Sequence, residues 1–248
     1  MMEEIRSRQN DIIKRFIALG SDGKARQQAG EYLCAGQTLL DEAIASEAEI
    51  TCVLGTGEDM PGLPYRRVTP ELLKAVSPLQ NSPGPVFTVR MGPLPTAEER
   101  KRVIVLENVQ DPGNVGTVLR TADAFGIDLV VLCGACADPY NPKTVRASMG
   151  AIFRQRLLEL PLSSLSERLN AWGLPLYGAA LSERAADVRS VPLSHAAVAV
   201  GNEGSGLTGE LLAMCEKELI IPMTPGSESF NAAVAASILL WEMARNDR

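Results

Sequence analysis

Residues 221–242 read IPMTPGSESFNAAVAASILLWE and contain the pattern from which the fold is interpreted. An apolar strand ends at Pro222, and a tight turn is expected over residues 224–227, where Pro and Gly permit a chain reversal. A helix is predicted from about residue 230 to residue 243. Its alanines are small on nearly every side, so other backbone can approach this helix closely.

The mouth of this helix is polar, although the helix itself is apolar. Ser227 or Ser229 is expected to cap the free backbone N–H groups, and Glu228 lies where the positive end of the helix dipole favours a carboxylate. Asn231 adds an amide at the same place. Capping alone would explain such a group, but two further stretches favour a binding site.

Two other strand-to-loop stretches have the same character. Residues 198–207, VAVGNEGSGL, combine a buried strand with a glycine-rich loop that holds one acidic residue. Glycines at this density indicate tight turns or backbone pressed against a flat group. Residues 107–126, ENVQDPGNVGTVLRTADAFG, follow an apolar strand, turn at Asp-Pro-Gly and enter a helix near Asn114.

These three stretches, in this order, resemble the three motifs of the SpoU-type (SpoU/TrmH) RNA ribose 2′-O-methyltransferases of the SPOUT superfamily. Residues 114–120 resemble the first motif, residues 201–207 the second, and residues 221–231 with their helix the third. Residues 146–153 also resemble a segment commonly found between the first and second motifs. The resemblance extends from about residue 100 to the C-terminus.

The length of 248 residues favours two domains. Residues 1–92 alternate helix and strand, which predicts a small α/β domain, and residues 93–99 are a Pro-rich linker. By the resemblance, the first domain is a substrate-binding domain akin to a ribosomal protein. Residues 100–248 are predicted to form an α/β domain with a mainly parallel sheet and helices on both faces. The resemblance implies that its C-terminal part makes a trefoil knot.

The elements expected in each domain follow from hydrophobic periodicity and from Gly and Pro signals. For the first domain the pattern predicts helices over 10–19, 36–45 and 69–76, with strands over 32–34, 50–54 and 85–89. In the second domain it predicts strands near 103–106, 129–132, 157–158, 175–179, 197–200 and 218–221. Helices are expected there from 114, near 141–148, and over 162–171, 208–214 and 230–243.

The resemblance implies that S-adenosylmethionine is the methyl donor. Its adenine is flat and apolar with hydrogen-bonding edges, which suits exposed loop backbone. The residues expected to bind it are Ala180, Leu181, Gly201, Asn202, Glu203, Gly204, Leu207, Ile221, Met223, Ser229 and Asn231.

The residues expected to carry catalysis are Arg120, Asn114, Glu203, Ser229 and Asn231. Arg120 matches an arginine for which the family proposal is general base toward the 2′-hydroxyl group. A guanidinium normally stays protonated, so a second role remains open, in which Arg120 grips the target phosphate and orients the ribose. Asn114 is expected to cap its helix and to fix the arginine. Glu203 is expected to accept hydrogen bonds from Asn114, Arg120 or the loop backbone.

The net charge of −6 disfavours nucleic acid as a partner, but the charges are unevenly distributed. Residues 1–30 hold six Lys or Arg against four Asp or Glu, and residues 100–156 hold eight against five. A cationic surface built from these two segments is compatible with RNA, because phosphate affinity depends on the local field.

Several other classes of protein are disfavoured. The N-terminus lacks the apolar core of a signal peptide, and the longest apolar run, near residues 129–136, is far shorter than the ~20 residues of a membrane helix. Five cysteines fit reduced cytosolic thiols, which predicts a cytoplasmic protein. Cys133 and Cys136 have CxxC spacing without a second pair, so neither a metal nor redox activity is expected. His195 stands without a Gly-x-Ser-x-Gly motif, which disfavours a hydrolase.

The resemblance therefore implies methylation of a ribose 2′-hydroxyl in structured RNA, and it also implies that the enzyme acts as a homodimer. Ribosomal RNA is favoured over transfer RNA because of the extra N-terminal domain. Two alternatives remain open: a non-catalytic RNA-binding protein of the same fold, and a methyltransferase acting on an RNA base.

Overall fold

A computed structural model describes residues 4–78, 84–93, 100–224 and 226–245. The chain divides into two compact units. The first unit combines Met1–Pro93 with Asp138–Phe153, and the second combines Leu94–Ala137 with Arg154–Arg248. Most of the expected linker, residues 94–99, lies outside the described residues.

The first unit contains a four-stranded mixed sheet in the order β1-β4-β2-β3. Strand β4 runs antiparallel to β1 and β2, whereas β3 runs parallel to β2. The strands are β1 (Glu31–Ala35), β2 (Ile50–Gly55), β3 (Tyr65–Arg67) and β4 (Val86–Arg90). The short strand β3 was not expected from the sequence.

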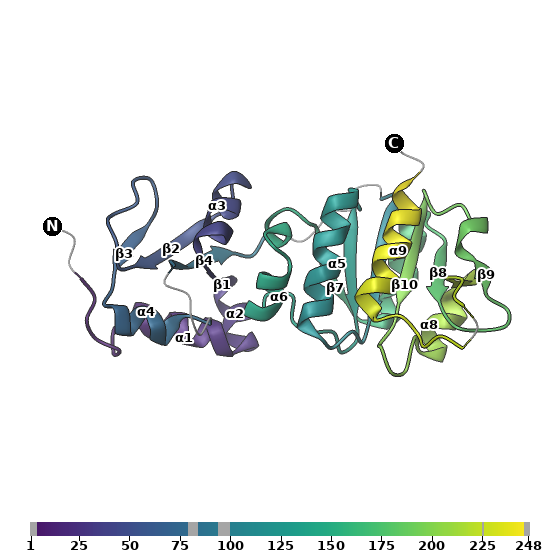
Figure 1. The fold of residues 1–248 in the computed structure, drawn as a ribbon, viewed down its shortest axis with the longest axis horizontal. Helices are drawn as coiled ribbons and strands as arrows, with labels where there is room; N and C mark the ends of the chain where they lie inside the picture. The colour runs from purple at the N-terminus through teal and green to yellow at the C-terminus, as the bar shows by residue number, and fades with distance from the viewer. Residues whose placement is uncertain (1–3, 79–83, 94–99, 225, 246–248) are drawn as a thin grey trace. The chain divides into compact units, whose positions relative to one another are not determined.

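Helices α1 (Asp11–Ser21) and α4 (Pro70–Val76) cover one face of this sheet (Figure 1). Helix α1 begins where predicted, because the Asn10 side chain accepts a hydrogen bond from the backbone N–H of Ile12. The core beneath the two helices is made of Ile13, Phe16, Leu19, Leu33, Leu54, Leu72, Leu73, Val76 and Val86. The unit also contains α2 (Gly23–Ala29) and α3 (Gln37–Ala45).

The segment Asp138–Phe153, which holds α6 (Pro142–Ala147), packs within the first unit. Sequence order alone instead predicts this segment to be part of the second domain. Aromatic contacts account for the difference: the ring of Tyr32 lies 4.9 Å from that of Tyr140 and 6.4 Å from that of Phe153. The buried Arg26 also donates from Nε and Nη2 to Asp138, at 2.9 and 2.5 Å. Sequence order cannot reveal such contacts.

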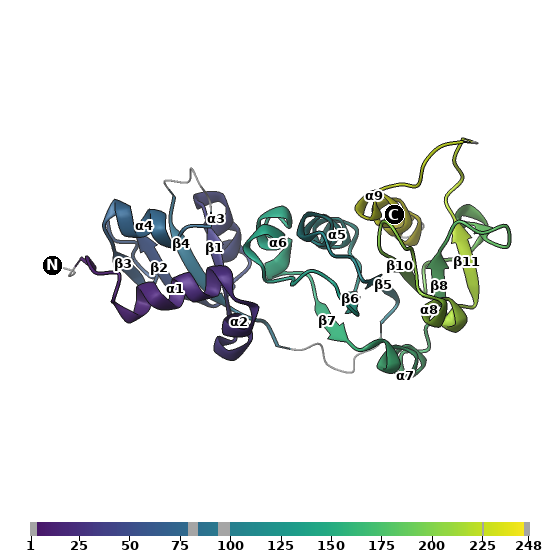
Figure 2. The same ribbon diagram turned by 90° about the horizontal axis from the view of Figure 1, so that it is seen from below.

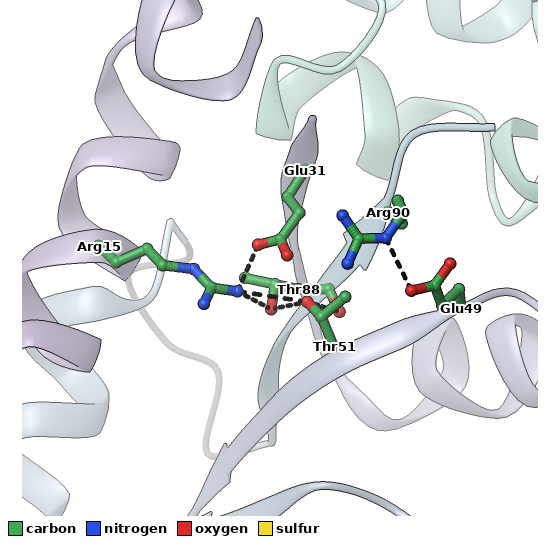
Figure 3. A network of polar contacts seen from close by, with 6 residues as sticks. All are labelled: Arg15, Glu31, Glu49, Thr51, Thr88 and Arg90. Carbon is green, nitrogen blue, oxygen red and sulfur yellow. Dashed lines mark hydrogen bonds and ion pairs between the residues drawn. The ribbon is translucent and has the colours of Figure 1, made fainter. Parts of the chain in front are cut away.

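A polar network joins α1 to strands β1, β2 and β4 (Figure 3). Arg15 donates to the carboxylate of Glu31, and the hydroxyl groups of Thr51 and Thr88 lie 2.7 Å apart. Thr88 and Glu31 are buried, so these partners satisfy groups that would otherwise be costly to desolvate.

The second unit is built on a seven-stranded parallel sheet, in the order β7-β6-β5-β10-β8-β11-β9. The strands are β5 (Arg102–Glu107), β6 (Leu129–Cys133), β7 (Leu157–Leu160), β8 (Leu176–Ala179), β9 (Ala186–Asp187), β10 (Ala196–Val200) and β11 (Lys217–Ile220). The predicted parallel sheet is thus confirmed, and β9 is an addition. Its central strands are continuous apolar runs, as expected of a sheet covered on both faces.

Helices lie on both faces of this sheet, which confirms the predicted layers. Figure 2 shows α5 (Pro112–Phe125) and α9 (Ala232–Ala244) side by side on one face. Helices α7 (Leu165–Ala171) and α8 (Gly209–Met214) lie on the other face. They bury Leu165, Leu169 and Leu211 against alternate residues of β5, β6 and β10.

One of the two helices that carry motif residues begins differently from expectation. Helix α5 is capped by Asp111, whose carboxylate accepts from the N–H of Asn114 at 2.9 Å, so Asn114 itself is not the cap. Helix α9 is capped by Asn231, which was also expected to cap it, and not by Ser227 or Ser229. In each case the helix begins after the residue whose short side chain accepts hydrogen bonds from the free N–H groups of the first turn.

Candidate active site

The carboxyl ends of β5, β8, β10 and β11 meet at one edge of the parallel sheet. From β5 the chain moves outward through β6 to β7, whereas β10 lies on the other side of β5. The loops after β5 and β10 therefore diverge at a topological switch point, which is the usual ligand site of an open α/β sheet.

A pocket of about 430 Å³ lies at this edge. Its volume falls within the range of about 300–1,000 Å³ that is typical of small-molecule sites. Every residue predicted to bind the methyl donor lines it except Asn231. The predicted residues that do so are Ala180, Leu181, Gly201, Asn202, Glu203, Gly204, Leu207, Ile221, Met223 and Ser229.

The pocket also contains residues that the sequence analysis did not single out, notably Ser182 and Glu218. Glu218 lies within β11, and Ser182 follows the end of β8. No sequence signal set Glu218 apart, because it follows Lys217 at the start of a short strand, where charged residues are common.

The glycine-rich loop after β10 folds back on itself. The backbone N–H of Asn202 donates to the carbonyl of Gly206 at 3.2 Å, and the reverse bond measures 2.9 Å. A Cβ atom on Gly201 would overlap with the backbone of Gly206 and Leu207, and Gly206 has a φ of 68°. Glycine is therefore required at both positions, which leaves the loop backbone facing the pocket.

Asn114 and Glu203 are brought together although they come from different motifs. The Nδ2 group of Asn114 donates a hydrogen bond to Oε1 of Glu203, which is one of the hydrogen bonds expected for Glu203. This contact links the first turn of α5 to the glycine loop and places a carboxylate at the rim of the pocket.

A second hollow, of about 540 Å³, lies between α5 and α9. Asn114 and Asn231 line it together, although the Oδ1 atom of Asn231 is already used to cap α9. The rest of its lining is mainly apolar, and Val234 and Trp241 are each 46% exposed. Partly exposed apolar side chains thus line a surface groove beside Asn114.

Arg120 is not brought to the pocket of its own chain. It lies on α5 six residues after Asn114, which at 3.6 residues per turn places it about 240° around the helix from that residue. The side chain is exposed, lines neither hollow, and makes no hydrogen bond or ion pair with the rest of the described chain. The structure thus groups Asn114, Glu203 and Ser229, and leaves Arg120 apart.

The cysteines of this unit are weak nucleophiles. Burial raises the pKa of Cys133 to about 12 and that of Cys215 to about 11, and it also raises the pKa of Cys136. Thiols that remain protonated at neutral pH react slowly. Among residues 4–78, 84–93, 100–224 and 226–245, no three His, Cys, Asp or Glu side chains come together as a metal site. Over the same ranges, every helix is too short or too polar to cross a bilayer.

Comparisons with known proteins agree with this architecture. Residues 101–241 match the model of the SpoU rRNA Methylase family. The chain is 32% identical to the 23S rRNA (guanosine(2553)-2′-O)-methyltransferase RlmP of Bacillus subtilis, over 98% of this chain and 99% of that protein.

Two solved structures extend the comparison to the fold. The AdoMet-bound rRNA methyltransferase from Sinorhizobium meliloti is 26% identical, with a TM-score of 0.86 over 99% of this chain and 98% of its own. The SpoU methyltransferase AviRb from Streptomyces viridochromogenes, in complex with AdoMet, is 25% identical, with a TM-score of 0.82 over 96% and 98%. Both the family match and the full-length similarity show that this chain belongs to the SpoU rRNA Methylase family.

Proposed function

We propose that this protein transfers a methyl group from S-adenosylmethionine to a ribose 2′-hydroxyl group in structured RNA, with ribosomal RNA as the favoured substrate. The observation that carries the proposal is the pocket at the sheet edge, in which the loop after β10 and the segment before α9 meet. Family membership and the ribosomal RNA specificity named for the Bacillus subtilis relative support the substrate class. A ribosomal RNA substrate is compatible with the expected cytoplasmic location, which is part of the proposal.

The residues present fit this donor. The loop backbone at Gly201 and Gly206 closes on itself and leaves no side chain where a flat adenine would lie. The small side chains of Ala232 and Ala235 leave room on the α9 side of the pocket, and Glu203 and Glu218 provide carboxylates that suit hydroxyl and ammonium groups. When bound, S-adenosylmethionine supplies an electrophilic methyl group.

The polar residues have positioning roles in this proposal. The hydrogen bond between Asn114 and Glu203 fixes both side chains at the rim, and the exposed Ser229 is available to bind the donor or a phosphate. Asn231 fixes the start of α9 beside them. In-line transfer depends on placement to within about an ångström, so these side chains contribute by orientation.

The homodimer is part of the proposal, because Arg120 lies away from the pocket of its own chain. A second copy that covers the hollow between α5 and α9 would bury Val234 and Trp241, and would allow Arg120 of the partner subunit to complete the site. A mixture of Arg120→Ala and Glu203→Gln subunits should then recover part of the activity that each variant lacks. If mixed subunits stay as inactive as the separate variants, Arg120 acts within its own chain.

Two features of the fold are proposed from the family. The C-terminal segment is taken to pass through a loop as a trefoil knot, which an experimental structure tracing residues 201–245 would test. The first unit is taken to be a ribosomal-protein-like substrate-binding domain. Its exposed cations are available for phosphate contacts, and they include Lys14, Arg66, Arg67, Lys74, Lys143 and Arg146.

The proposed reaction is tested with labelled donor and 23S rRNA transcripts, followed by nuclease digestion that separates methylated ribose from methylated base. Label in the ribose is expected. Label in a base would instead identify an RNA base methyltransferase. Donor binding in a calorimeter without transfer to any rRNA or tRNA would favour the non-catalytic alternative.

A further inference from the structure

Glu107 is a buried carboxylate that the proposed reaction does not use. It ends β5 after four apolar residues and is 1% exposed. Both of its oxygens are bound by a single residue: Oε2 accepts from the backbone N–H of Thr208 at 2.7 Å, and Oε1 accepts from its hydroxyl group at 2.6 Å. Burial of a carboxylate is costly without such partners, so the two hydrogen bonds from Thr208 stabilise Glu107 in this buried position.

Thr208 is the residue at which the glycine loop ends and α8 begins. Its hydroxyl oxygen accepts from the N–H of Leu211 at 3.2 Å while its proton is donated to Glu107. The capping residue is therefore itself held by the strand. As a result, the end of the loop is fixed to β5 rather than to α8 alone.

The start of the glycine loop is bonded to Asn108, the residue that follows Glu107. Asn202 donates from Nδ2 to the carbonyl of Asn108 at 3.1 Å, and its Oδ1 accepts from the N–H of Gly204 at 2.9 Å. Asn108 has a φ of 56° and accepts from the N–H of Ala135 at 2.7 Å, so it is itself held in place. Two consecutive residues thus hold both ends of the loop.

The segment between these two ties lines the donor pocket and includes Glu203. The chain runs directly from Asn108 into the turn before Asn114, which bonds to Glu203. The first and second motifs therefore share one rigid frame, and Glu107 is its buried anchor.

We propose that Glu107 is a positioning residue whose carboxylate holds the glycine loop in its donor-binding conformation and so sets the affinity for the donor. This inference rests on the proposed function. A loop released from Thr208 would have to be ordered again when the donor binds, and that cost appears as weaker binding.

The test is calorimetric titration of S-adenosylmethionine into the full chain carrying Glu107→Gln. Glutamine keeps the shape but replaces one acceptor by an N–H donor that faces the donors of Thr208. Loss of a charge-assisted hydrogen bond predicts a roughly tenfold rise in the Kd of the donor, and an equal rise in its KM. The kcat at saturating donor is expected to change much less, since Glu107 touches neither ribose nor methyl group.

A matched pair at Thr208 keeps the inference testable if Glu107→Gln folds poorly. Thr208→Val removes the hydroxyl group and should weaken donor binding, whereas Thr208→Ser retains it and should bind like the wild type. Hydrogen exchange without ligand should be faster at the amides of residues 202–208 in Glu107→Gln and Thr208→Val only.

The possible outcomes are distinct. If wild-type protein binds the donor and Glu107→Gln binds it equally well, or if only its melting temperature falls, the positioning role is overturned. If the wild-type protein itself does not bind the donor, the proposed function fails, and unchanged exchange in the loop would separately refute the anchor.

Discussion

The two units treat their polar side chains in different ways. In the first unit, each of two buried ionisable groups is bonded to a partner of opposite charge: Arg26 to the part-buried Asp138, and Glu31 to the exposed Arg15. In the second unit the strands are apolar inside, and polar side chains gather at the carboxyl edge, where Glu203 and Ser229 border open space. Polar groups bonded only to one another fix a fold, whereas groups that border a pocket keep bonding capacity for a ligand.

Arg120 is a polar group that makes no hydrogen bond or ion pair with the rest of the described chain. Its removal is expected to have the largest effect on activity. Arg120→Ala should lower the single-turnover rate of methyl transfer by about 10²- to 10⁴-fold, because it removes either a proton acceptor or the group that orients the ribose. Donor binding, measured by calorimetry, should stay within a few-fold of the wild type.

The matched control is Arg168→Ala, which removes an exposed arginine of α7 on the opposite face of the sheet. Its turnover should equal that of the wild type. A collapse of donor binding in Arg120→Ala would instead show that Arg120 is structural, and the contrast between the units would lose its main example.

The next largest effect is expected in the first unit, where a buried pair is broken. Asp138→Ala leaves the 3% exposed Arg26 without its carboxylate, which should lower the free energy of unfolding by about 3 kcal/mol. Both tryptophans, Trp172 and Trp241, lie in the second unit. Urea unfolding followed by circular dichroism should therefore show an earlier transition that tryptophan fluorescence does not.

Glu49→Gln is the control for this prediction, since it breaks an ion pair between Glu49 and Arg90 that is exposed to solvent. Exposed pairs contribute little, so no measurable change in unfolding is expected. An equal decrease in the free energy of unfolding in both variants would mean that the buried pair of Arg26 and Asp138 contributes no more to stability than the exposed pair.

A smaller effect is expected where the second unit bonds its own polar groups. Asn114→Ala and Glu203→Gln should each lower kcat/KM. When these losses are expressed as free energies, the double variant should lose less than the sum of the two single variants, with a coupling energy of about 1–2 kcal/mol. Asp123→Ala is the control, because it lies nine residues further along α5, or roughly 14 Å by helix rise. Additive effects for Asn114 and Glu203 would contradict the hydrogen bond between them.

The second unit was more predictable from sequence than the first. Its strands are long apolar runs closed by Gly, Pro and Asn, so periodicity located β5, β6 and β10 and the loops after them. The motif residues could be grouped because parallel strands end at one sheet edge. Helix period alone also separates Arg120 from Asn114, a step that the sequence analysis did not take.

The features that were missed depend on contacts between distant residues. Helix α2 reads as a polar stretch, and its Arg26 is buried only because Asp138 returns to meet it. Strands β3 and β9 are too short for a periodic signal. The cap of α5 was misassigned, and that of α9 was left open among Ser227, Ser229 and Asn231, because several such residues lie close to each helix start and sequence does not show which one caps it.

The smallest expected effect comes from an exposed pair that belongs to the second unit but not to its site. Hydrogen bonds from the Arg189 side chain and backbone hold the pKa of Asp187 at about 2, below its ordinary 3.8. Since the pKa is lowered in the folded state, the stabilisation is present above the unfolded pKa and is lost as pH falls through about 2. Carboxyl NMR titration should show this pKa rising toward 3.8 in Arg189→Gln and unchanged in Arg184→Gln. A wild-type Asp187 that titrates near 3.8 would contradict the pairing with Arg189.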